Sequence, residues 1–123
     1  MHFAREDFSA ELSIRAYAAG EITVGQHSYR NSLILSRQGV ITDWRPQRHQ
    51  ELTEQDFEIV ESLRPEIILL GTGSGLHFPP PGITARLLGE GIGVEVMDTA
   101  AACRTYNILL SEERQVVAAL LLR

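Results

Sequence analysis

Several residues around one glycine-rich loop are of types that can bind an anion or a small ligand. The apolar run at 67–70 is typical of a buried strand, and the loop at 71–78 follows it directly. Successive backbone amides in such a loop can form a concavity for an anion, and a nearby arginine would add charge. The glycines could instead serve only to turn the chain sharply out of a sheet. The candidate ligand-binding residues are Gly71, Thr72, Gly73, Ser74, Gly75, His77, Arg86 and Thr99.

The loop does not match the motifs of well-known catalytic or nucleotide sites. A phosphate loop requires a lysine, whereas all eleven basic residues of this chain are arginine. The dinucleotide motif requires a third glycine where Leu76 stands. A serine hydrolase would use Ser74 with His77 and Asp98. The motif of such a serine requires a glycine two positions before it and another two positions after it, where this chain has Thr72 and Leu76. The sequence therefore assigns no catalytic residue, and enzymatic activity stays undecided, with the balance against it.

Neither a metal, a cofactor nor a disulfide is predicted. The four histidines lack the spacing of metal ligands, and the single cysteine, Cys103, has no partner for a disulfide or a multi-cysteine zinc site. Cys103 lies among alanines in a predicted helix, which is typical of a small buried hydrophobic residue.

The composition limits the classes of partner and the location. A chain of 123 residues with 44% hydrophobic residues suits one globular domain. The net charge is −5 and no arginine cluster occurs, so the basic surface that nucleic-acid binding needs is missing. The longest apolar runs, 67–70 and 116–122, are far shorter than the roughly 18–20 residues of a membrane span. Because the N-terminus also lacks a signal-peptide pattern, we expect a soluble, cytoplasmic protein.

The front half of the chain predicts an antiparallel β meander. Residues 12–41 alternate apolar and polar side chains between short turns, and Pro46 ends the pattern because proline cannot donate to a ladder. Residues 1–11 are expected to form a loosely ordered arm, which leaves a single domain at 12–123.

The second half predicts strands and helices in alternation. Thr53 is expected to open a first helix that Pro65 ends, and Thr99 is expected to cap the last helix. Such alternation requires a mostly parallel mixed sheet covered by helices, with the run before the glycines as an interior strand. The predicted elements are a strand at 66–70, a helix at 83–90, a strand at 94–97, a helix at 100–110 and a strand at 116–122.

Three strings together resemble the Mth-domain family. They are PEIILLGTG at 65–73, VMDTAA at 96–101 and RTYNILLSEERQVVAAL at 104–120. This family contains a mitochondrial respiratory complex I assembly factor, an adipogenesis-associated protein and many uncharacterised bacterial proteins. The resemblance implies an α/β domain whose central mixed sheet carries helices and an extra β layer from the meander, with no established catalytic residues. The lack of a transit-peptide pattern at the N-terminus leads us to expect a bacterial member.

Two functions remain open at this point. The resemblance favours a non-enzymatic protein-binding or assembly factor with protein partners. The alternative is a small-molecule or anion binder, or an unrecognised enzyme, that uses the loop at 71–78. A polar pocket with convergent amides and an arginine would favour the alternative, whereas an exposed apolar patch would favour protein binding.

Overall fold

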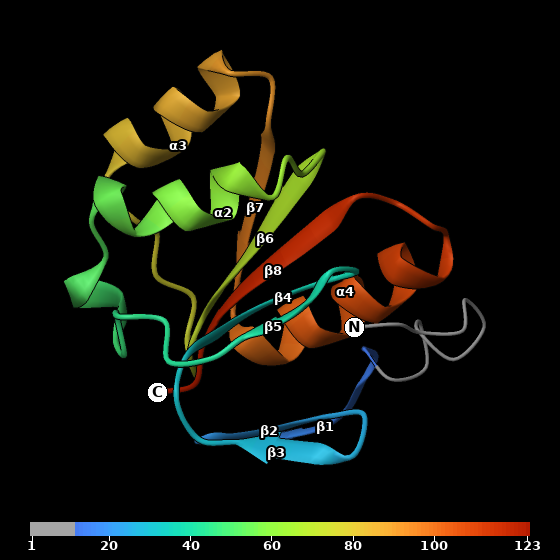
Figure 1. The fold of residues 1–123 in the computed structure, drawn as a ribbon. Helices are drawn as coiled ribbons and strands as arrows, with labels where there is room; N and C mark the ends of the chain where they lie inside the picture. Colours follow the sequence, from blue (N-terminus) through green and yellow to red (C-terminus); the bar gives the residue numbers. More distant parts are fainter. Residues whose placement is uncertain (1–11) are drawn as a thin grey trace.

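The computed structural model describes residues 12–123, in which two β-sheets and the helices pack in layers (Figure 1). The arm expected at 1–11 lies outside the described residues. The strands are β1 (Ile14–Ala18), β2 (Glu21–Val24), β3 (His27–Tyr29), β4 (Leu33–Ser36), β5 (Gly39–Ile41), β6 (Ile67–Thr72), β7 (Gly93–Met97) and β8 (Val116–Leu121), and the helices are α2 (Glu58–Ser62), α3 (Pro81–Gly89) and α4 (Thr99–Ser111), with 3₁₀ turns η1 (His49–Glu51) and η2 (Glu54–Phe57).

The central sheet is mixed and has the strand order β5-β4-β8-β6-β7. The strand β6 lies between β8 and β7 and runs parallel to both, while β4 is antiparallel to β8 and β5. Every residue of β8 is buried, as are five of the six residues of β6, so both strands need cover on both faces. The predicted α/β class and the interior, parallel-paired strand before the glycines are confirmed, although β6 extends to Thr72.

The predicted meander divides between the two sheets. Strands β1, β2 and β3 pair only with one another and form the extra layer, whereas β4 and β5 join the central sheet. All four residues of β4 are buried, which requires a covered interior position. Most residues of β1 are exposed or half-buried, which suits an outer layer.

Helices cover the two faces of the central sheet in two separate cores (Figure 1). One core joins α4 and the three-stranded sheet to one face and contains Tyr106. The other packs α2, α3 and η2 on the opposite face and contains Phe57. No helix within 12–123 has the length and apolar character needed to cross a membrane.

The helix starts confirm one capping prediction and correct another. Thr53 opens η2 through a capping box with Asp56, as expected. The expected Thr99 cap of α4 is wrong, because the side chain of Asp98 occupies that role and accepts the amide of Ala101 at 2.8 Å. Thr99 is instead the first residue of α4, and its hydroxyl is bonded elsewhere.

Candidate functional site

The hydroxyl of Thr99 anchors the glycine-rich loop where β6, β8 and α4 meet. It accepts the amide of Gly73 at 2.8 Å and donates to the carbonyl of Leu121 at 2.5 Å. The Thr99 amide also donates to the Gly73 carbonyl at 2.9 Å. Because Thr99 is fully buried, these bonds fix the exit of β6 without competition from water.

Two glycines are needed here because neighbouring groups come very close. A Cβ at Gly71 would lie 2.9 Å from the Thr99 hydroxyl oxygen. Gly73 has a φ of +94°, and a Cβ there would lie 2.1 Å from the carbonyl oxygen of Arg123. Close packing at Gly71 and the turn at Gly73 therefore account for both glycines, which agrees with the alternative that they serve to turn the chain out of the sheet.

The hydroxyl of Thr72 closes the loop that follows. It donates to the carbonyl of Gly75 at 2.6 Å and accepts the amide of His77 at 3.2 Å. Thr72 is itself buried. The two threonines together fix the loop backbone from within.

The ring of His77 stacks on the ring of His49 from η1. The ring centroids are 3.8 Å apart and the planes differ by 5°. Burial, and secondarily the neighbouring His77, lower the pKa of His49. The lowered pKa favours the uncharged form of the His49 ring in the stack. The candidate residues predicted from the sequence did not include His49, because no local pattern links His49 to His77, which lies far from it in the chain.

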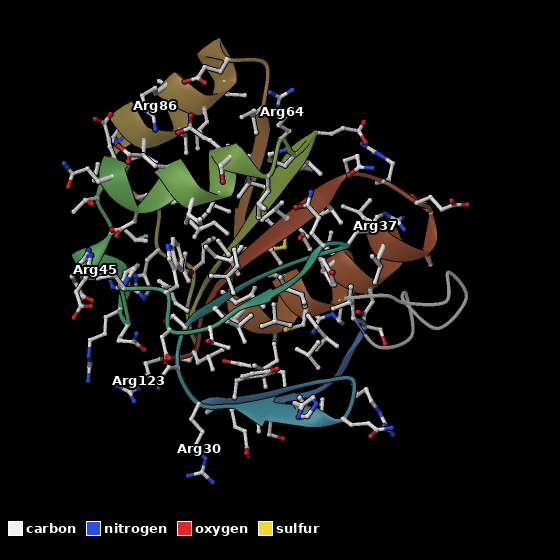
Figure 2. All side chains as sticks on the ribbon, in the orientation of Figure 1. Arg30, Arg37, Arg45, Arg64, Arg86 and Arg123 are labelled. Carbon is white, nitrogen blue, oxygen red and sulfur yellow. The ribbon has the colours of Figure 1, made fainter. Side chains whose placement is uncertain are left out.

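Arg86 does not join the other predicted ligand-binding residues. Its guanidinium bonds to Glu61 of α2 and to Glu90 at 3.2 Å. Figure 2 shows Arg86 on α3 near the top of the view, well away from Arg123, whose carbonyl borders Gly73. The Gly73 amide, expected to bind an anion, is taken by Thr99.

The hydrolase arrangement weighed from the sequence does not assemble. Asp98 caps α4 and His77 stacks on His49. Within residues 12–123, no hydrogen bond joins either of them to Ser74.

Two large apolar side chains on the same loop project into solvent. Leu76 is 51% exposed and Phe78 is 74% exposed. We call the group formed by His49, Leu76, His77 and Phe78 the loop surface. Sequence reasoning did not single out Leu76 or Phe78 as binding residues, although two large apolar residues between glycines and prolines were a usable signal.

Comparison with known proteins gives the family. The model of a protein family of unknown function, DUF498/DUF598, matches residues 14–121. The chain belongs to this family. The family agrees with the resemblance to Mth-domain proteins found in the sequence, because the solved structures similar to this chain include a Mth938-like domain.

Two curated relatives of this DUF498/DUF598 chain carry different names. A mouse protein, NADH dehydrogenase (ubiquinone) 1 alpha subcomplex assembly factor 3, is 32% identical over 119 residues, which is 95% of this chain and 64% of the mouse protein. The 13 kDa major membrane protein of Francisella tularensis subsp. holarctica (strain LVS) is 30% identical over 117 residues, covering 94% of this chain and 95% of that protein. The chain thus spans just under two thirds of the assembly factor.

Solved structures share the fold of this DUF498/DUF598 chain. A Bordetella parapertussis protein superposes with a TM-score of 0.84 at 39% identity, covering 90% of this chain and 95% of that one. The Mth938-like domain of a Bordetella pertussis protein superposes with a TM-score of 0.79 at 32% identity, covering 99% of this chain and 91% of that one.

Proposed function

We propose that this chain is a non-enzymatic protein-binding factor of the assembly-factor type and that the loop surface contacts its protein partner. The observation that carries the proposal is the exposure of Phe78, at 74%, beside the half-exposed Leu76. Relatives named as assembly factors support the class of function. The bacterial origin and cytoplasmic location expected from the sequence stay predictions.

The energetics of the loop surface suit a protein interface. Burying a large apolar side chain contributes roughly 1.5–3 kcal/mol, and aromatic residues often dominate binding energy. The loop that carries Phe78 is already fixed by the hydroxyls of Thr72 and Thr99. A fixed loop loses little conformational freedom on binding, so more of the burial energy contributes to affinity.

The contacts of the loop favour protein binding over the anion alternative. The Gly73 amide is bonded to Thr99, and Arg86 is paired with Glu61 and Glu90 away from the loop. Two groups that the anion alternative relied on are therefore engaged elsewhere.

The double variant Leu76→Ser, Phe78→Ser tests this proposal. Wild-type and variant chains are used as bait in the cells of the source organism, and captured proteins are quantified by mass spectrometry. We expect one or a few proteins to fall by about tenfold or more with the double variant, because the apolar contact is lost.

The matched control is Ile108→Ser, which removes a 57% exposed apolar residue from α4. The control should retain the partners that the double variant loses, and both variants should melt within a few degrees of the wild type. Recovery of the same proteins in the same amounts with the double variant would overturn the proposal.

A further inference from the structure

A hollow lies between β1 and α4, on a different part of the molecule from the loop surface. Its volume is about 230 Å³. Four consecutive residues of β1 and four residues of one face of α4 line it. They are Ile14, Arg15, Ala16, Tyr17, Ala100, Cys103, Arg104 and Asn107.

Two arginines face this hollow without a partner. Neither Arg15 nor Arg104 forms an ion pair or a side-chain hydrogen bond with any residue of the described range 12–123. The carboxylate of Asp98, which acts electrostatically on Tyr17, already accepts the Ala101 amide. Among the described residues the positive rim of the hollow is therefore left without a counter-charge, in a chain whose net charge is −5.

A buried donor with no acceptor lies in the same wall. The hydroxyl of Tyr17 is buried and makes no hydrogen bond to any residue that the structure describes. Burial, with Cys103 and Asp98 as smaller causes, raises the pKa of Tyr17, so the phenol stays protonated. Burial likewise raises the pKa of Cys103 to about 12, so its thiol is neutral and does not repel an anion. A buried donor left without an acceptor costs free energy that a ligand could recover.

The local backbone is built to present Arg15 and to hold the hollow open. The pairing of β1 with β2 shifts register between Ile14 and Ala16, so Arg15 lies at an irregularity of the strand pair, as in a β-bulge. Bulges redirect a side chain that a regular strand would send to the other face. The side-chain amide of Asn107 accepts the Ile14 amide at 2.8 Å and donates to the Ile14 carbonyl at 2.7 Å, which fixes β1 against α4.

We propose that this hollow binds a small organic anion, with a carboxylate or phosphate group between Arg15 and Arg104 and an apolar body against Ala16, Ala100 and Cys103. Guanidinium groups pair with both kinds of oxyanion through two parallel hydrogen bonds. The volume suits a molecule about the size of one aromatic ring. This site is independent of the loop surface.

An NMR titration of the full chain tests the site. The probes are benzoate, phenyl phosphate and the uncharged benzamide, each added to about 10 mM against the ¹⁵N-labelled protein. We expect at least one anion to shift the amides of Ala100, Cys103 and Arg104 saturably, with a dissociation constant near 1 mM or below. Benzamide should produce no saturable shift, and comparison of the two anions identifies the preferred head group.

A double variant and a matched control separate specific binding from general charge attraction. Arg15→Gln, Arg104→Gln should weaken binding by about tenfold or more, whereas Arg48→Gln, Arg64→Gln, with the same change in charge, should leave it within about twofold. The Leu76→Ser, Phe78→Ser variant should bind the anion like the wild type. Absence of saturable shifts with both anions, or unchanged affinity in Arg15→Gln, Arg104→Gln, would overturn the proposal.

Discussion

At the scale of single residues, two buried threonine hydroxyls decide the shape of the glycine-rich loop. Thr99 joins the Gly73 amide to the Leu121 carbonyl, and Thr72 joins the Gly75 carbonyl to the His77 amide. Each hydroxyl both donates and accepts, which no apolar side chain of the same size can do. The loop is therefore specified by side-chain chemistry in addition to its glycines.

Thr99→Val tests this role. Valine keeps the volume but leaves the Gly73 amide buried without its acceptor, so we expect the unfolding free energy to fall by about 1–3 kcal/mol. Urea denaturation measures the change. Thr99→Ser is the control, because it keeps the hydroxyl and loses one methyl group, at a cost of about 1 kcal/mol. Equal stability of the valine and serine variants would contradict a hydrogen-bonding role.

At the scale of elements, α4 links the outer three-stranded sheet to the central sheet. The helix packs on β6, β8 and β1. Because β1 is an edge strand, its outer side has no neighbouring strand, and Asn107 bonds the amide and the carbonyl of Ile14 there instead. The edge of β1 is thereby partly blocked, which also limits unwanted pairing with other strands.

Asn107→Ala should loosen β1 from α4. Because two partly buried backbone groups lose their partners, we expect the unfolding free energy to fall by about 1–3 kcal/mol and the Ile14 amide to exchange faster with solvent. Hydrogen exchange followed by NMR measures the local effect. Asn31→Ala, which removes an exposed bond to Asp43, is the control and should change neither quantity appreciably. Unchanged exchange at Ile14 in Asn107→Ala would show that the amide bonds do not hold the strand.

At the scale of the whole molecule, one ionic cluster links the segment after β5 to the core around Phe57. Arg45 donates two bonds of 2.8 Å to the carboxylate of Asp56, which also accepts the amide and the hydroxyl of Thr53. Burial alone would raise the pKa of Asp56, but the bonds from Arg45 and Thr53 outweigh it and hold that pKa below its ordinary value of 3.8.

The stability of the molecule should therefore depend on pH through Asp56. Its contribution is fully present above the ordinary pKa and is lost as the pH falls through the lower pKa of the folded state. We expect the unfolding free energy of the wild type to fall more steeply than that of Asp56→Asn between about pH 5 and pH 2. Thermal melts across this range measure the slopes. Parallel slopes would contradict the assignment.

Much of the fold followed from local patterns. The apolar runs that became β6 and β8, the capping residue Thr53 and the alternation of strands with helices are visible within short windows, because burial on both faces requires continuous apolar sequence. The division of the meander was less visible. The sequence showed alternation throughout, and only packing separated β1–β3 from β4 and β5.

The sequence by itself determined the α/β class, the central position of the strand before the glycines and the family. Tertiary structure alone decided which side chains meet: Thr99 with Gly73 across 26 positions, Arg86 with Glu61 across 25, and Asn107 with Ile14 across 93. Secondary structure follows from periodicity between near neighbours, whereas these bonds form between residues that only the packed layers bring together. For the same reason the sequence placed Arg86 at the loop, whereas in the folded chain Arg86 pairs with Glu61. The hollow between β1 and α4 was likewise not predicted, because its lining residues come from two distant segments.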